Sequence, residues 1–301
     1  SFLQRMRSNG TRPKRQPPAK LSTMSEWGQL GVLRQNWKPN SSKVGFKFCS
    51  KRSCLEISNG NRLIEGDCTP RVKVDGTELE VSSEIGVSGF VKFDFGEFVE
   101  LEMEYGQSKL YRQILFLRDD QLIFLNDNFS APLESRIELE NQFPLGESVN
   151  VIRESETNEF YLKVKKDYAL VVPLSFPEWK IENRMDRGNR FDIGLESRQL
   201  SLCQNVFGKG LSLATVFDLK PSRSLKPRTW RQLTIAEKMK TVHRDEAVAY
   251  RLQIGKQPWL FYRAISTSGN RTFLGQNFAC DFWVGKMDLN GTVSTILEID
   301  T

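Results

Sequence analysis

The one histidine of the chain, His243, limits the chemistry that its side chains could perform. A metal site built on several histidines is impossible, and a Ser-His-Asp or Cys-His nucleophilic arrangement would have to use this residue. His243 lies among charged residues in the stretch KTVHRDEAV. This setting predicts an exposed turn, and a catalytic role is the alternative.

Cysteine spacing gives no sign of a metal or redox site. The chain has an odd number of cysteines, and none of them is in a C-x-x-C motif: Cys49, Cys54, Cys68, Cys203 and Cys280. A zinc ribbon or a thioredoxin-like site is therefore not indicated. Cys203 and Cys280 have apolar neighbours and are expected to be buried free thiols. Cys49 and Cys54 could instead form a disulfide if they lie on facing strands. With no glycine-rich phosphate loop either, we expect no metal and no cofactor.

Six tryptophans offer a different chemistry, the stacking of aromatic faces on sugar rings: Trp27, Trp37, Trp179, Trp230, Trp259 and Trp283. Stacking requires an exposed ring with polar groups nearby. Trp37 and Trp179 lie beside loop signals and are the candidate carbohydrate-binding residues. Trp259 and Trp283 alternate within apparent strands, which predicts that they belong to the core. For each tryptophan, core packing is the competing interpretation.

The net charge of +6 is concentrated at one end of the chain. Residues 1–20 contain six basic residues and no acid, and the rest carries 37 basic and 37 acidic residues. A balanced body does not favour nucleic acid, since nucleic-acid-binding domains present a basic face. Residues 1–24, which include three prolines, are expected to form a basic flexible linker that is solvated or contacts an anionic polymer. No apolar run approaches the roughly 18–20 residues that span a bilayer, so no membrane segment is expected.

The rest of the sequence alternates with a period of two, which is the pattern of β-strands. In the segment 97–105, Val99, Leu101 and Met103 share one face, and the intervening glutamates indicate a wet face. Residues 110–118 and 121–127 predict a hairpin that is covered on both sides. The pattern over 25–301 predicts an all-β fold, a large antiparallel, supersandwich-like β-sandwich with very little helix. One short helix is expected at Ala236–Val242, and a subdomain seam is expected near 218–228.

Three segments carry a resemblance to a known family. They are WGQLGVLRQNW at 27–37, LYRQILFLRDDQLIFLND at 110–127, and the run 250–299. Together they resemble the C-terminal β-sandwich region of heparinase II/III-like proteins, which are polysaccharide lyases with an α/α toroid followed by antiparallel sheets. The third segment is similar to the end of large bacterial members of uncharacterised role. The resemblance implies that residues 25–301 are the β part of a longer protein, joined through the basic linker to an N-terminal toroid.

The resemblance also implies a chemistry, the removal of a proton next to a uronate carboxylate. Arg34, Tyr262, Arg263 and His243 are the residue types that such a reaction uses. Tyr262 and Arg263 are neighbours in a strand and should point to opposite faces. The histidine-bearing motifs of the family are absent. We therefore expect a non-catalytic module that contacts acidic polysaccharide. The alternatives are a polysaccharide lyase that needs the toroid, and a purely structural or interaction domain.

Overall fold

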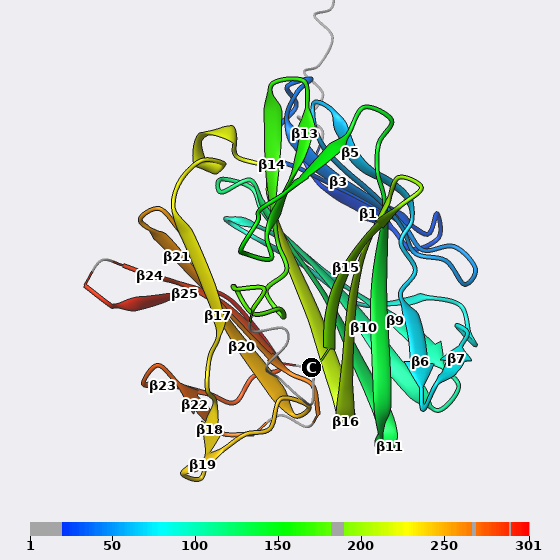
Figure 1. Ribbon diagram of the computed structural model, residues 1–301, viewed down its shortest axis with the longest axis vertical. Coiled ribbons are helices and arrows are strands. Elements are labelled where there is room, and N and C mark those ends of the chain that lie inside the picture. The colour runs from blue at the N-terminus through cyan, green and yellow to red at the C-terminus, as the bar shows by residue number, and fades with distance from the viewer. Residues whose placement is uncertain (1–19, 182–189, 267–268, 289, 301) are drawn as a thin grey trace, which may run out of the picture.

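A computed structural model describes residues 20–181, 190–266, 269–288 and 290–300, and these residues form four antiparallel sheets (Figure 1). The N-terminal sheet contains β1 (Thr23–Ser25), β2 (Leu30–Arg34), β3 (Ser42–Lys47), β4 (Cys54–Asn59) and β5 (Arg62–Asp67). The C-terminal sheet contains β17 (Arg228–Gln232), β20 (Ala247–Ile254), β21 (Gln257–Ala264), β24 (Phe282–Met287) and β25 (Val293–Ile299). The outer sheet contains β18 (Ala236–Glu237), β19 (Lys240–Thr241), β22 (Arg271–Phe273) and β23 (Gln276–Phe278).

The central sheet is the largest. Its members are β6 (Arg71–Val74), β7 (Thr77–Leu79), β8 (Gly86–Phe93), β9 (Gly96–Tyr105), β10 (Ser108–Leu117), β11 (Leu122–Pro144), β12 (Asn150–Arg153), β13 (Phe160–Val164), β14 (Asp167–Val172), β15 (Arg190–Glu196) and β16 (Gln199–Asp218). Its spatial order is β12-β13-β14-β16-β11-β10-β9-β8, with β15 beside β16 and the pair β6–β7 beside β11. The long strands β11 and β16 run antiparallel through its middle, with an irregularity between Ser130 and Ser135.

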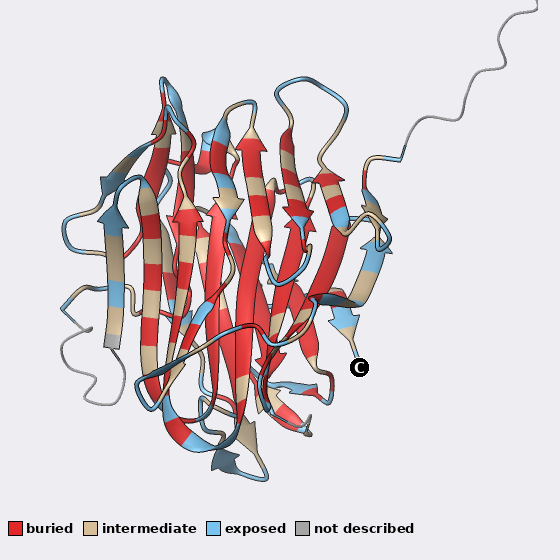
Figure 2. Cartoon of the chain, turned by 90° about the vertical axis from the view of Figure 1, so that its right-hand side faces the viewer, coloured by how far each residue is buried: buried red, intermediate tan, exposed pale blue. Residues whose placement is uncertain are grey.

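Three apolar cores separate these sheets into layers. One core, which includes Phe46 and Leu101, lies between the N-terminal and central sheets. A second, which includes Phe124 and Phe261, lies between the central and C-terminal sheets. A third, which includes Phe273, lies between the C-terminal and outer sheets. In Figure 2 the strands inside this stack are largely buried, and exposed residues gather at turns and outer strands. The predicted all-β antiparallel sandwich is confirmed.

The hairpin predicted from residues 110–127 is present as β10 and β11. The two strands pair from Leu117↔Leu122 to Lys109↔Ser130, and a turn from Arg118 to Gln121 joins them. The apolar residues at the closed end of the hairpin are fully buried on both faces. They are covered because the central sheet has another sheet packed on each side.

The glutamates of β9 do not share one wet face, contrary to the prediction. Glu102 and Glu104 are partly exposed, but Glu100 is 3% exposed. Its carboxylate accepts hydrogen bonds from Gln113 (2.8 Å) and Ser88 (2.9 Å) and lies 3.4 Å from Arg263. The period of two identified the face correctly, but it could not show that the C-terminal sheet covers part of it.

The helix expected at Ala236–Val242 is also wrong. These residues form a tight hairpin that consists of β18, a two-residue loop and β19, with Glu237 paired to Lys240. Lys238 and Met239 form the loop, with φ values of 49° and 63°. Spacings of three residues between apolar side chains fit one helical turn and a tight hairpin equally well, and the contact of Ala236 with β22 favours the strand.

The segment 218–228 carries the chain from the central sheet to the C-terminal sheet. It contains the short 3₁₀ helix η2 (Pro221–Arg223). Arg223 is buried, and its guanidinium donates two hydrogen bonds to the carboxylate of Asp218, at 2.9 and 2.6 Å. A seam between subdomains at this point stays a prediction. Most of the predicted linker 1–24 lies outside the described residues, and Thr23–Ser25 form β1.

Within the described ranges, the structure has no helix long and apolar enough to cross a membrane.

Candidate carbohydrate-binding pocket

A pocket lies where the connection after β14 runs along β17, the edge strand of the C-terminal sheet. Its volume is about 480 Å³. The connection contributes Trp179, β15 contributes Phe191, β17 contributes Arg231, and the turn before β20 contributes Arg244. Ligand pockets in proteins commonly measure about 300–1,000 Å³. The pocket is therefore large enough for a small ligand or for part of a longer one.

The connection is fixed to the edge strand by hydrogen bonds. The Glu178 carboxylate accepts from the backbone N–H of Trp230 at 3.1 Å and from the hydroxyl of Thr229. The Trp230 indole donates to the backbone carbonyl of Phe176 at 2.9 Å. These bonds satisfy polar groups at an edge that would otherwise be open, so the wall of the pocket is held in place.

The same connection is anchored at its other end in the layer between the central and C-terminal sheets. The Ser175 hydroxyl donates to the backbone carbonyl of Ser212 (2.9 Å) and lies 3.0 Å from the hydroxyl of Tyr250. Burial raises the pKa of Tyr250 to about 12, against the opposing effect of side-chain hydrogen bonds with Ser175 and Ser212. Tyr250 therefore stays neutral near neutral pH, as a hydrogen-bonding anchor.

The lining combines an aromatic ring with cationic groups. Trp179 is 44% exposed, as the sequence predicts for a ring that could stack on a sugar. Arg231 and Arg244 are exposed beside it, and the rings of Phe176 and Phe191 pack 5.0 Å apart behind it. An aromatic face can stack on the C–H face of a pyranose ring, and guanidinium groups bind carboxylates or sulfates.

Sequence reasoning missed both arginines of this pocket. They come from different segments of the chain, and neither has a spacing that distinguishes it from the other basic residues. Arg231 alternates with Trp230, which is buried, and this alternation was the one sequence signal that placed its side chain on the outside.

Trp37, the other predicted sugar platform, lies in the connection between β2 and β3 of the N-terminal sheet. It is 55% exposed, and the Arg34 guanidinium lies 5.0 Å from the centre of its ring. Trp27 is nearly fully exposed, whereas Trp230, Trp259 and Trp283 are buried. The prediction that Trp259 and Trp283 belong to the core is confirmed.

His243 lies on the surface, as its charged neighbours predict. Its Nδ1 atom hydrogen bonds to Asp245, whose other carboxylate oxygen accepts from the backbone N–H of Lys209 at 2.9 Å. The pair lines a separate hollow of about 650 Å³ that also includes Ser266. Asp245 therefore orients the imidazole, but the ring remains largely in solvent.

Tyr262 and Arg263 point to opposite faces of β21. Tyr262 is 1% exposed in the core beneath the outer sheet, and its hydroxyl accepts from Arg271 at 3.3 Å. Arg263 faces the central sheet and Glu100. Arg34 lies across the central sheet from both. The structure therefore does not bring Arg34, Tyr262, Arg263 and His243 together.

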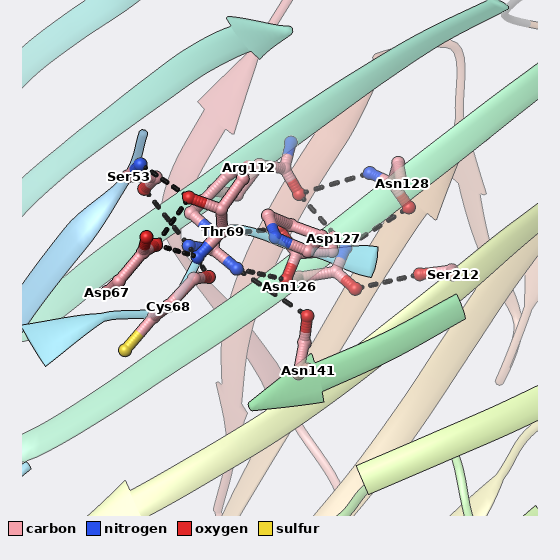
Figure 3. A network of polar contacts seen from close by, with 12 residues as sticks. Ser53, Asp67, Cys68, Thr69, Arg112, Asn126, Asp127, Asn128, Asn141 and Ser212 are labelled. Atoms are coloured by element: carbon pink, nitrogen blue, oxygen red, sulfur yellow. Dashed lines mark hydrogen bonds and ion pairs between the residues drawn. The ribbon is translucent and has the colours of Figure 1, made fainter. Parts of the chain in front are cut away.

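An extended polar network lies inside the protein (Figure 3). Arg112 is fully buried and forms a bidentate pair with Asp127, at 2.8 and 2.9 Å. Its remaining N–H groups point to the Ser53 hydroxyl (3.0 Å), the Cys68 carbonyl (2.6 Å) and the Asn141 amide oxygen (3.5 Å). This network joins the N-terminal sheet to the central sheet and is inaccessible to a ligand.

All five cysteines are free thiols, so the possible Cys49–Cys54 disulfide is absent. Burial raises the pKa of the Cys68 thiol to about 12, which keeps it protonated and unreactive near neutral pH. Among the described residues, no group of three or more His, Cys, Asp or Glu side chains is placed to hold a metal ion.

Comparison with known proteins finds a likeness in structure but no match in sequence. No family model matches the chain, and no curated protein matches it. Among solved structures, a heparinase III is similar with a TM-score of 0.57 and 13% identity, over 82% of this chain and 42% of that one. A heparan sulfate lyase from Pedobacter heparinus is similar with a TM-score of 0.54 and 12% identity, over 83% and 43%. A further heparinase III structure has a TM-score of 0.53 and 10% identity, over 79% and 41%.

At such low identity, this likeness shows a shared fold and nothing more. The chain spans less than half the length of the solved structures that it matches. The all-β sandwich described above is therefore similar in fold to a part of these lyases.

Proposed function

We propose that this chain is the β-sandwich region of a heparinase II/III-like protein and that it contacts acidic polysaccharide without carrying out the elimination reaction itself. The observation that carries the proposal is the pocket in which exposed Trp179 lies beside two arginines. The likeness in fold to heparinase III and to a heparan sulfate lyase supports the choice of ligand class. An N-terminal α/α toroid in the same protein is part of this proposal.

The proposal for a non-catalytic role is supported by the positions of the candidate residues. Tyr262 is buried, Arg263 is nearly so, and Arg34 lies on another sheet. A base, an acid and a group that neutralises the carboxylate must all reach one sugar residue in a lyase. The four residues do not meet this requirement within the described part of the chain.

Binding to purified polysaccharides tests this function. Heparin, heparan sulfate, chondroitin sulfate and alginate should bind to the chain, while neutral dextran should not, and raising the salt concentration should weaken binding. Absence of binding to millimolar oligosaccharide by a protein with an intact β-sheet circular dichroism spectrum would refute it. That result would favour a purely structural or interaction domain.

Lyase activity is the second candidate, because the solved structures of similar fold are lyases. Elimination creates an unsaturated uronate that absorbs ultraviolet light. A rise in absorbance with any of the four acidic polysaccharides would establish this alternative, and a flat trace in all four would support the non-catalytic role.

A further inference from the structure

We propose that the pocket beside β17 is a subsite for one anionic sugar residue, in which Trp179 stacks on the ring and Arg231 and Arg244 bind its carboxylate or sulfate. This inference rests on the proposed function and assigns that function to a particular site. The arguments concern how the pocket is built, its charge and the shape of its lining.

The pocket is preorganised, because both of its walls are fixed. Glu178 and the Phe176 carbonyl hold the connection against Trp230, and a backbone bridge pairs Trp179 itself with Thr157. A ligand that contacts these held residues does not have to order them, so less of the interaction energy is lost on binding.

The charge of the lining favours an anion. Among the lining residues that the structure describes, Glu178 is the one carboxylate, and its Oε2 atom already accepts two hydrogen bonds from β17. Arg231 is exposed and forms no ion pair with any residue in the described ranges. Its planar guanidinium presents paired N–H groups that match the oxygens of a carboxylate or sulfate.

The exposed ring of Trp179 indicates that the carboxylate or sulfate belongs to a sugar. A free sulfate or phosphate would need no ring beside the arginines, whereas a pyranose presents an apolar face to an indole. A nucleotide would also combine a flat ring with an anion. The body of the protein carries 37 basic and 37 acidic residues, and this balance does not fit a nucleic-acid partner.

Isothermal titration of the whole chain with defined hexasaccharides tests the subsite. One arm uses an unsulfated uronate oligomer and the other uses a sulfated oligomer, so the two sources of negative charge are separated. Arg231→Gln should weaken binding by about 10- to 100-fold, the range for a lost hydrogen bond to a charged group. Trp179→Ala should weaken it by about 3- to 10-fold, and Trp179→Phe should retain most of the affinity.

Arg52→Gln provides the matched control, since it removes the same charge from an exposed arginine outside the pocket. It should change affinity less than 2-fold at physiological salt. Arg231→Lys should give an intermediate loss, because it keeps the charge but not the paired geometry.

The outcomes separate this inference from the proposed function. Binding by the unchanged protein that persists in both Arg231→Gln and Trp179→Ala overturns the subsite but leaves the function standing. An equal loss in Arg52→Gln overturns it as well, since binding would then follow charge alone. Tighter binding of adenosine monophosphate than of either hexasaccharide overturns the sugar assignment. Absence of binding by the unchanged, folded protein overturns the function itself.

Discussion

Asp127→Asn should strongly destabilise the protein, because it leaves the buried guanidinium of Arg112 without its counter-ion. Both side chains are completely buried, and two of the five guanidinium N–H groups donate to this carboxylate. An asparagine keeps one acceptor oxygen but turns an N–H₂ group toward the other guanidinium nitrogen. Breaking a buried ion pair in this way costs about 3–5 kcal/mol. The free energy of unfolding from urea titration should fall by this amount, and Tm should fall by roughly 5–8 °C in a chain of 301 residues.

Two further variants make this test specific. Glu78→Gln breaks an ion pair with Arg71 in which both side chains are about half exposed, and it should cost at most about 1 kcal/mol. Arg112→Met combined with Asp127→Leu removes both charges, so it should be more stable than Asp127→Asn alone. A loss below about 1 kcal/mol in Asp127→Asn would show that this pair does not hold the sheets together, and the reasoning would be refuted.

Three further predictions concern other parts of the structure. Glu178→Ala leaves the Trp230 N–H without its acceptor and should lower the free energy of unfolding by about 1–3 kcal/mol in urea titrations. Glu156→Ala on the exposed surface is the control and should leave this free energy unchanged. Lys238 and Met239 have positive φ angles in the tight hairpin, and replacing them by Asn-Gly should relieve the backbone strain of that conformation. The variant should be more stable by about 1 kcal/mol and should melt at a higher temperature. A lower melting temperature would contradict this. Burial raises the pKa of the Cys68 thiol from 9.0 to about 12, so the contribution of this thiol to stability should be fully present below pH 9 and be lost as the pH rises toward 12. The urea midpoint of the unchanged protein should therefore fall more steeply over this range than that of Cys68→Ala. Equally steep falls in the two proteins would rule out this contribution.

The sequence was sufficient to predict the strands but not what covers them. The hairpin of β10 and β11 could be predicted because its apolar run and turn are local features. Glu100 has the same alternation as Glu102 and Glu104, and only the C-terminal sheet, which arrives more than a hundred residues later, makes it buried. Local spacing cannot contain this information.

The candidate site was predicted in part for the same reason. Trp179 lies between two charged residues and two residues after a proline, and these neighbours correctly placed it in an exposed connection. Arg231 and Arg244 line the pocket only because the fold brings β17 and the turn before β20 beside that connection. Pockets that are built from distant segments require the tertiary structure, since a pattern along the chain describes each segment by itself.

The β10–β11 hairpin fixes the register of the central sheet through polar residues on both of its faces. Arg112 pairs with Asp127 toward the N-terminal sheet, and Gln113 lies opposite Asn126 toward the C-terminal sheet. The paired residues at the closed end of the hairpin are all apolar and buried on both faces, so burial alone does not distinguish the native pairing from one shifted along the strand. A shift of one residue would set the buried guanidinium against an asparagine instead of a carboxylate, at a cost similar to that of Asp127→Asn. The polar layers therefore specify which of several hydrophobic pairings is native, and with it the alignment of the layers that form the pocket beside β17.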